Sequence, residues 1–368
     1  MQGVSTAAQA PDPPRGRRPK GLVDLVVPAS TQRCMTLPGV DRLLELRWAA
    51  RISRAPVMTP EQHAAAVADP RRRAASIEVP IACVLCGGTR LQALLHVHKH
   101  PRWDYHVVRC AACGLLLRHP GIRPDRLGDL YSSGKYAEFL GGKYTRKRIR
   151  RYRTTMAPFR RLFKAGDGRR LLDFGCGNGL FLELAHRRGF DVHGVDLAAD
   201  AIAVARRKPS GQHAHHGHPT DIPELAAGGF DVITMWSVLA HLAQPVDDLT
   251  MLRGLLAPDG VLLLLTVNAA SLKLKHQLDA WGGFTPNHLA FFAPDTLRRL
   301  LRRAGFRAVV MPPWYGGPVE RGRSRLSQRE ERRLRAAIDR GNRGNMLRAA
   351  AFADPDTPQR WGLRGTLL

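Results

Sequence analysis

Residues 171–179 read Leu-Leu-Asp-Phe-Gly-Cys-Gly-Asn-Gly, and this stretch decides the fold. An apolar run ends in an acid and three alternating glycines, and a helical pattern follows over residues 180–188. This order predicts a buried strand, a tight turn and an amphipathic helix. Glycines let a ligand approach the backbone closely, and the free N–H groups at a helix N-terminus attract an anionic group. We therefore expect a ligand site at this turn.

Strand and helix patterns alternate from residue 171 to residue 311. Such alternation is typical of a doubly wound α/β sheet. We also expect a charged helix over residues 326–340 and a late strand over residues 346–352 at the sheet edge. The predicted strands are residues 171–174, 191–196, 230–236, 261–267 and 306–311, and the predicted helices are residues 180–188, 199–207, 246–256 and 294–304.

The glycine spacing distinguishes two kinds of nucleotide site. A dinucleotide site needs G-x-G-x-x-G, in which the third glycine falls one position later than it does here. This sequence reads D-x-G-x-G-x-G, with Asp173 two residues before Gly175 and with Gly177 and Gly179 after it. A second acid, Asp196, ends the next predicted strand. The pattern therefore differs from the dinucleotide fingerprint.

The D-x-G-x-G-x-G stretch resembles motif I of the class I S-adenosylmethionine-dependent methyltransferases. Residues 229–233 resemble the fourth strand of that family, and residues 255–261 resemble its L-L-x-P-G-G turn, with Asp259 in place of one glycine. Residues 287–297 are similar to a subfamily signature, H-L-x-x-F-[ST]-x-x-x-L. The subfamily carries a zinc-ribbon-like module before the methyltransferase domain and often acts in sugar, polysaccharide or natural-product pathways.

The resemblance covers residues 80–311 and extends to residues 344–353. It implies a Rossmann-like class I methyltransferase fold, preceded by a small zinc-ribbon-like β module. It also implies S-adenosylmethionine as methyl donor, with the Asp196 carboxylate accepting hydrogen bonds from the ribose hydroxyls. An acid after the third strand usually recognises adenine; Asp221 is the candidate, although His218 occupies the more usual position. The implied donor-binding residues are Asp173, Gly175, Gly177, Gly179, Asp196 and Asp221.

Two C-x-x-C pairs, Cys83/Cys86 and Cys110/Cys113, precede this region, and each pair is followed by a glycine. Six cysteines in 368 residues are too few for a disulfide framework, so the pairs favour a metal. Four thiolates at this spacing suit a closed, tetrahedral structural Zn²⁺. The alternatives are a ribbon that packs without metal, or ligands drawn from the nearby histidines His96, His98, His100 and His106.

The residues that bind the methyl acceptor are expected after the fourth and fifth strands. The family form after the fourth strand is V-L-E-H-L, and here Ala240 replaces the glutamate while His241 keeps the histidine. His241 suits a general base or a core histidine equally. His288 is a second candidate base, and Trp281 is either a stacking wall or ordinary packing. Asn268 is a further candidate for covering the acceptor.

The chain carries 57 basic against 31 acidic residues, a net charge of +26. The excess is densest at residues 141–170, where basic residues interleave with Tyr144 and Tyr152. This pattern predicts either a solvated helix face or a nucleic-acid patch. A second histidine-rich cluster is weak evidence for metal by itself; it consists of His213, His215, His216 and His218.

We interpret the chain as an S-adenosylmethionine-dependent methyltransferase acting on O or C of a small-molecule or sugar-linked acceptor. The alternatives are an RNA methyltransferase that uses the ribbon and the basic patch, and an inactive binding protein. No apolar run is long enough to span a membrane, and the N-terminus is a poor signal peptide, so we expect a cytoplasmic protein. The expected parts are a flexible or weakly ordered extension (1–75), a zinc-ribbon-like module (76–120), a basic helical linker (121–166), a methyltransferase domain (167–353, with an insertion at 313–343 that carries the charged helix) and a tail (354–368).

Overall fold

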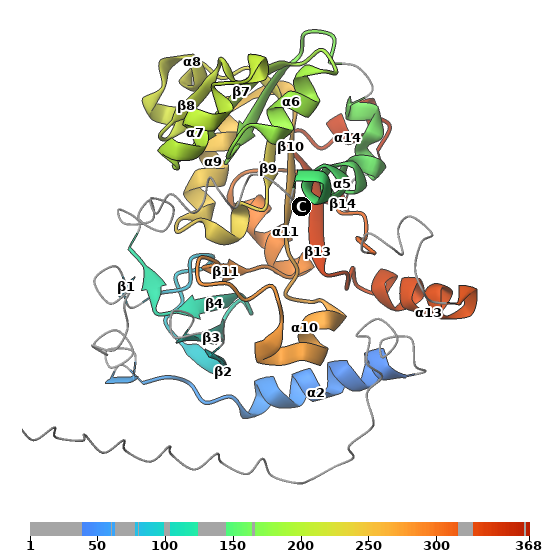
Figure 1. Ribbon diagram of the computed structural model, residues 1–368. Coiled ribbons are helices and arrows are strands. Elements are labelled where there is room, and N and C mark those ends of the chain that lie inside the picture. Colours follow the sequence, from blue (N-terminus) through green and yellow to red (C-terminus); the bar gives the residue numbers. More distant parts are fainter. Residues whose placement is uncertain are drawn as a thin grey trace, which may run out of the picture.

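The computed structural model contains three sheets within the part of the chain that it describes (Figure 1). An eight-stranded sheet forms the methyltransferase-like region, a four-stranded sheet forms the ribbon region, and two short strands pair beside it. The described residues are 39–59, 61–62, 78–79, 81–98, 104–123, 145–163, 166–315, 327–363 and 366–368.

The large sheet has the order β14-β12-β13-β10-β9-β6-β7-β8, and its strands from β10 to β8 are parallel. This order confirms the predicted doubly wound sheet and is the class I methyltransferase arrangement. Its strands are β6 (Arg170–Phe174), β7 (Asp191–Asp196), β8 (Ala214–His216), β9 (Phe230–Trp236), β10 (Leu256–Val267), β12 (Ala308–Val310), β13 (Met346–Phe352) and β14 (Thr366–Leu367).

Connecting helices follow the strands of this sheet as the sequence alternation predicts. The first of them, α6, begins directly after the glycine turn and buries Phe181 and Leu182. Parallel strands need such crossovers, because the chain must return to the same edge of the sheet before each new strand. These helices are α6 (Leu180–His186), α7 (Ala199–Ala205), α8 (Pro223–Ala226), α9 (Pro245–Leu255) and α11 (Pro294–Arg303).

The late strand β13 was predicted at the sheet edge, and that placement is wrong. It pairs antiparallel with β10 on one side and with β12 on the other, so it lies inside the sheet. All seven of its residues are buried, including Arg348. The Arg348 guanidinium donates to the carbonyls of Pro312, Pro313 and Thr154. A buried arginine is tolerated in an interior strand because its donors find acceptors.

The ribbon sheet has the order β11-β4-β3-β2, and one of its edge strands, β11, comes from a segment that follows β10 of the large sheet. Ala290 and Phe291 of β11 pair with Leu117 and Leu116 of β4. The subfamily signature therefore completes the ribbon sheet. The strands are β2 (Leu91–His98), β3 (Asp104–Cys110), β4 (Leu116–His119) and β11 (Ala290–Phe291), and the separate pair is β1 (Glu78–Val79) with β5 (Gly121–Ile122).

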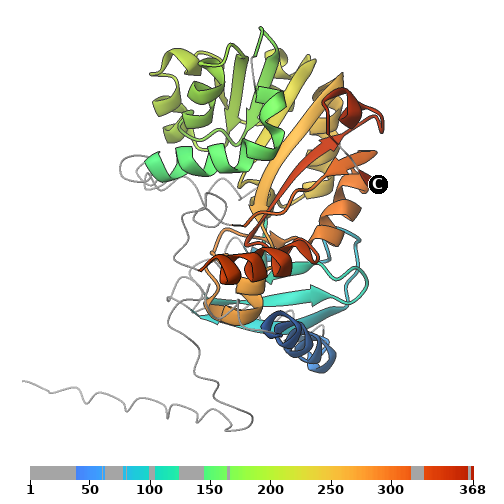
Figure 2. The ribbon, with the colours of Figure 1, turned by 90° about the vertical axis from the view of Figure 1, so that its right-hand side faces the viewer.

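The helix α2 (Val40–Arg54) lies against the ribbon sheet, at the opposite end of the molecule from β7 and β8 (Figures 1 and 2). Its Arg51 donates to the Leu94 carbonyl, and its Glu45 pairs with Lys275 of α10 (Leu272–Gln277). The α2 part of the expected N-terminal extension is thus bonded to the remainder of the protein. The other helical segments are α5 (Thr145–Met156), η4 (Ala157–Phe163), η5 (Pro209–Gly211), η6 (Pro219–Asp221), η7 (Leu239–His241), η8 (Leu278–Ala280), α13 (Gln328–Asp339) and α14 (Thr357–Arg360).

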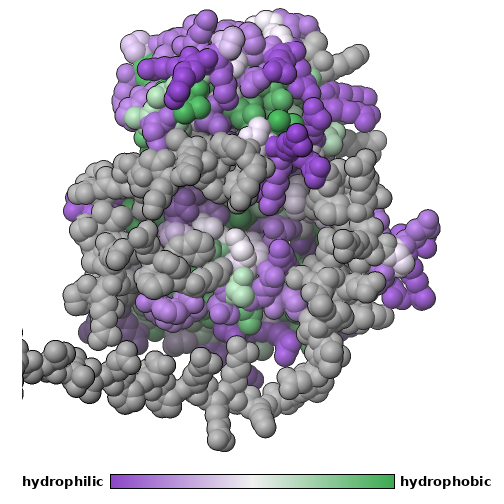
Figure 3. Space-filling view, viewed as in Figure 1, coloured by the Kyte–Doolittle hydropathy of each residue, from purple (hydrophilic) through white to green (hydrophobic). Residues whose placement is uncertain are grey.

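The described surface in Figure 3 is mostly hydrophilic, with small apolar areas over the methyltransferase-like region. The helices that the structure describes are all too short or too polar to cross a bilayer. Much of the expected linker, residues 124–144 including Tyr144, lies outside the described residues, as do residues 1–38, 60 and 63–75 of the expected extension.

Candidate functional site

The glycine turn lies at the carboxyl end of β6 and opens α6. Gly175, Gly177 and Gly179 have φ angles of 76°, 55° and 70°. Residues other than glycine rarely adopt such positive φ angles. At Gly175 a Cβ would also come within 2.3 Å of Val238 Cγ2. The turn therefore needs glycine for its backbone conformation, and at Gly175 for its contact with the loop after β9.

Asp196 ends β7 and faces this turn. Its Oδ2 accepts the Gly177 N–H at 2.8 Å, and its Oδ1 accepts the Ala198 N–H at 2.9 Å. Burial raises its pKa, while these two N–H groups oppose the shift. The structure thus places the Asp196 carboxylate against the glycine turn at Gly177.

Asp173 lies at the end of β6, and its side chain is buried. The Thr234 hydroxyl donates to Asp173 Oδ1 at 2.6 Å. Burial raises the Asp173 pKa to about 7; the Asp196 charge adds to this shift, whereas Thr234 and Arg148 oppose it. Two neighbouring carboxyls, those of Asp173 and Asp196, therefore border the turn, which is a suitable environment for a cation.

Arg148 of α5 is a site residue that the sequence reasoning did not single out. Its guanidinium donates to Asn178 Oδ1 in the glycine turn and to the Tyr152 hydroxyl, each at 3.2 Å. Lys208 Nζ donates to the Asn178 carbonyl at 2.7 Å. The charge run at residues 141–153 contained this residue, but only the tertiary structure separates it from its solvated neighbours.

Binding of nucleic-acid bases at the basic run would require exposed aromatic rings among the basic residues. Tyr152 is buried and packs on Phe181 and Trp236, with ring centroids 5.2 and 6.0 Å away. Stacking on a base would need an exposed ring, so Tyr152 does not supply one. Most of the described cations of this helix are exposed, as on a solvated helix face.

The region expected to recognise adenine follows β8. Asp221 is exposed, and its carboxylate accepts the neighbouring Thr220 hydroxyl at 3.2 Å. His218 instead contacts Thr220 Oγ1 at 2.8 Å and lies 3.6 Å from Asp248 Oδ1. Leu197, directly after Asp196, is an apolar side chain that is 43% exposed beside the turn. Its exposure was not visible in the sequence.

The two candidate bases, His241 and His288, contact each other, with ring centroids 4.6 Å apart. His241 Nδ1 lies 2.9 Å from the Asn287 carbonyl, and His288 Nδ1 lies 2.7 Å from the Gly283 carbonyl. A carbonyl only accepts, so each Nδ1 carries the proton. Burial lowers the pKa of His241 to about 3 and that of His288 to about 4, so both rings are neutral at pH 7.

Two other residues that were candidates for covering the methyl acceptor, Trp281 and Asn268, have structural contacts instead. Trp281 is fully buried against Phe284 and donates to Asn345 Oδ1 at 2.9 Å, so it belongs to the core of this segment. Asn268 donates to the carbonyls of Asn342 and Gly344, and its own oxygen accepts a backbone N–H. These bonds occupy both its amide hydrogens and its carbonyl oxygen, which argues for a structural role.

The four cysteines of the two C-x-x-C pairs converge, with sulfur atoms all within 4.8 Å of one another. Cys83 and Cys113 are 3.4 Å apart, and Cys86 and Cys110 are 3.5 Å apart, so neither pair is a disulfide. Two glycines, Gly87 and Gly114, have positive φ angles that turn the backbone after each pair. Tetrahedral thiolate coordination fits this arrangement.

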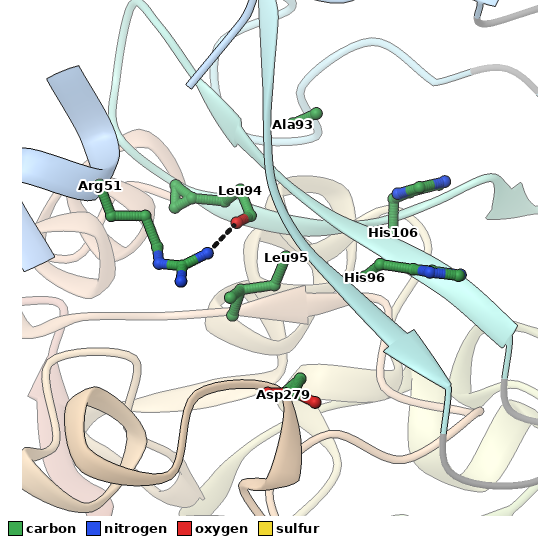
Figure 4. A pocket seen from close by; sticks show the side chains of 7 residues that line it. All are labelled: Arg51, Ala93, Leu94, Leu95, His96, His106 and Asp279. Atoms are coloured by element: carbon green, nitrogen blue, oxygen red, sulfur yellow. Dashed lines mark hydrogen bonds between the residues drawn. The ribbon is translucent and has the colours of Figure 1, made fainter. Parts of the chain in front are cut away.

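A separate pocket of about 280 Å³ lies between α2, the ribbon sheet and η8. Its lining includes Arg51, His96, His106 and Asp279, none of which belongs to the glycine turn or the histidine pair (Figure 4). His96 and His106 stack, with centroids 4.7 Å apart. His96 and His106 thus line this pocket, whereas His100 lies outside the described residues.

A family model described as a methyltransferase domain matches residues 144–310. Residues 144–310 thus match a methyltransferase domain, and the strand order and the glycine turn of the same residues agree with this match.

Two relatives carry the name ubiquinone biosynthesis O-methyltransferase. The protein from Roseobacter denitrificans is 37% identical over 163 residues, which cover 41% of this chain and 65% of the relative. The protein from Aromatoleum aromaticum is 32% identical over 155 residues, covering 39% of this chain and 66% of the relative. The chain thus spans just under two thirds of the length of these relatives.

A solved S-adenosylmethionine-dependent methyltransferase from Archaeoglobus fulgidus superimposes with a TM-score of 0.42 and 20% identity, covering 59% of this chain and 97% of that one.

Proposed function

We propose that the protein transfers a methyl group from S-adenosylmethionine to a hydroxyl oxygen of a small-molecule acceptor. The observation that supports this proposal most directly is the glycine turn with the Asp196 carboxylate directed at it. The relatives named O-methyltransferases support oxygen over carbon as the accepting atom. Sugar-linked acceptors belong to the same proposal, because their reacting group is also a hydroxyl.

The turn offers a matching group for each part of the donor. The Asp196 carboxylate would accept the ribose hydroxyls, and the exposed side chain of Leu197 would pack on the adenine. Asp221 remains the candidate for a polar contact with adenine. Arg148 and Lys208, both at Asn178, would attract the carboxylate of the amino-acid part.

S-adenosylmethionine supplies a methyl group that is already activated on a sulfonium. The protein must then align the acceptor hydroxyl and exclude water. Because Nδ1 of His288 is protonated, its Nε2 carries the lone pair and would accept the proton of the hydroxyl as the new C–O bond forms. The S–CH3 bond would break in the same step, and S-adenosylhomocysteine would leave. His241 packs against His288 and would hold the orientation of its ring.

The loop after β9 connects the two halves of this site. Val238 touches the turn at Gly175 and lies three residues before His241. His288 is held near this loop because the Leu289 N–H donates to the Ala240 carbonyl at 2.7 Å. The proposed base therefore lies on a segment bonded directly to the loop that borders the donor turn.

Donor binding tests the proposal most directly. Isothermal titration calorimetry with S-adenosylmethionine should detect binding to the wild type, with a loss of affinity of about 100-fold in Asp196→Ala. Asp295→Ala, an exposed acid at the start of α11, serves as the control and should bind normally. Absence of donor binding by the wild type contradicts the proposal.

We also propose a structural Zn²⁺ at Cys83, Cys86, Cys110 and Cys113. A closed four-thiolate site leaves no open position for chemistry, so the metal would stabilise the ribbon. Elemental analysis of the purified protein should find about one tightly held zinc ion, which is lost in Cys86→Ser. A protein that retains its fold and its zinc content in that variant contradicts the assignment.

A further inference from the structure

A second group of metal-ligating side chains lies at the β8 edge of the large sheet. His193 comes from β7, His213 precedes β8, His215 lies in β8 and Glu224 belongs to α8. The ligand atoms of His193, His213 and Glu224 are all within 4.8 Å of one another. Figure 1 shows β7, β8 and α8 together at the top of the molecule, far from the ribbon sheet at the bottom.

His193 is the buried member of this group, with a side chain only 5% exposed. Its Nε2 lies 3.2 Å from Asp191 Oδ2, and an ionised carboxylate only accepts, so Nε2 donates. The other ring nitrogen, Nδ1, is buried and makes no aligned hydrogen bond, although it lies 3.1 Å from Glu224 Oε1. A neutral His193 thus directs a lone pair at a carboxylate oxygen.

A metal cation between His193 Nδ1 and Glu224 Oε1 would remove the repulsion between the lone pair and the carboxylate oxygen. His213 Nδ1 approaches the same Glu224 Oε1 at 2.6 Å from the solvent side. Two ligands on a tetrahedral ion, each about 2.0–2.1 Å from the metal, lie roughly 3.3 Å apart. The 3.1 Å separation of His193 and Glu224 is close to this value. The exposed His213 side chain has room to adjust to it.

We propose that His193, His213 and Glu224 bind a divalent transition-metal ion such as Zn²⁺, with a fourth position open to water. Imidazole and carboxylate ligands suit this class of ion. Asp191 would orient His193 from behind, in the carboxylate–histidine–metal arrangement common at metal sites.

His215 Nε2 lies 3.1 Å from the other Glu224 oxygen, Oε2, and is buried without an aligned hydrogen bond. It would orient Glu224 in the same way. This site differs from the four-cysteine site in both ligand type and place. It would fasten α8 to the end of the sheet, on the segment that continues from β8 into residues 217–221.

Zn²⁺ titration of the full-length protein with its cysteine site loaded tests the proposal. At pH 7.5 calorimetry should detect one further site in the wild type. His213→Ala and Glu224→Gln should each weaken it by about 10–100-fold. Both residues are partly exposed, so these variants should fold, which their thermal unfolding will confirm. His186→Ala, an exposed histidine of α6, is the matched control and should bind like the wild type.

Co²⁺ distinguishes the two sites by their ligands. Co²⁺ added after the cysteine site is filled with zinc should give weak visible bands without the intense thiolate charge-transfer absorption. A second site with thiolate absorption, or unchanged binding in both His213→Ala and Glu224→Gln, overturns the proposal. So does a wild-type protein that takes up no further metal, because the cluster is then an imidazolium–carboxylate pair only.

Discussion

At the scale of single residues, the half-buried histidines His241 and His288 are the groups whose substitution should affect methyl transfer to the acceptor. Both imidazoles donate through Nδ1 to backbone carbonyls and are neutral at pH 7. Of the two, His288 is the candidate base, and His241 supports it from 4.6 Å away. Substitutions of His288 and His241 should therefore have different effects on kcat.

We expect His288→Ala to lower kcat by about 10²–10⁴-fold while the affinity for S-adenosylmethionine stays near that of the wild type. The pKa of His288 is lowered to about 4, so the acid limb of the wild-type kcat/KM profile should fall near that pH and not near 6.5. Steady-state kinetics between pH 4 and 9 checks both points. A variant with unchanged kcat removes His288 from the role of base.

Asp173 should couple donor binding to proton release. Its pKa is raised to about 7 by burial, so near neutral pH a fraction of the carboxyl is protonated in the free protein. A sulfonium donor favours the ionised form, so affinity should fall as pH drops below 7, by at most about tenfold per pH unit. Calorimetry in buffers of different ionisation enthalpy measures the released proton.

The isosteric Asp173→Asn is the matching variant, because its oxygen can still accept the Thr234 hydroxyl. It should bind the donor weakly and without proton release. The raised pKa also means that the folded state holds a proton which the unfolded state loses above pH 3.8, so this carboxyl destabilises the fold as pH rises towards 7. The variant should therefore show a smaller loss of stability over that range; an unchanged pH dependence contradicts this assignment.

At the scale of secondary-structure elements, the ribbon and the acceptor side are physically joined. The Leu289 carbonyl accepts the Arg118 N–H of β4, and the next two residues pair as β11 with the same strand. Directly before this contact lies His288. The ribbon therefore holds the segment that carries the proposed base.

Loss of the ribbon metal should damage acceptor turnover more than donor binding. A misplacement of the His288 segment by about 1 Å would cost about 100-fold in kcat/KM for the acceptor. Cys113→Ser should show this loss with a donor Kd close to that of the wild type. Cys34→Ser, a cysteine outside both pairs, serves as the control. Equal losses at donor and acceptor would show that the effect is global unfolding.

At the scale of the whole molecule, the ribbon and methyltransferase regions share one hydrophobic core. Leu91 and Leu117 of the ribbon pack in the same buried cluster as Phe292 and Leu300. Arg303 adds a hydrogen bond from α11 to the Leu85 carbonyl beside the cysteines. A shared core makes separate unfolding of the two regions unfavourable.

Calorimetric unfolding of the zinc-loaded protein should therefore show one cooperative transition that includes both regions. Removing the proposed zinc with a chelator should move that transition to lower temperature, because the metal binds the folded state and so stabilises it. Circular dichroism and tryptophan fluorescence should report the same midpoint. Two separate transitions in the zinc-loaded protein contradict a shared core.

The sequence alone predicted those features that depend only on residues close together along the chain. The strands β7 and β9 have the predicted bounds, because period and turn residues are readable within a few positions. The glycine turn and the two cysteine pairs were equally readable, since positive φ angles and ligand spacing depend on neighbouring residues. The resemblance to motif I pointed to Asp196, and the structure places its carboxylate against Gly177.

Tertiary structure alone decided whatever depends on distant segments meeting. It placed β13 inside the sheet, added β11 to the ribbon and selected Arg148 from a run of similar cations. It also brought His193 and Glu224, 31 residues apart, to within 3.1 Å. Such contacts arise because packing and burial act between side chains whose separation along the chain carries no information about their separation in space.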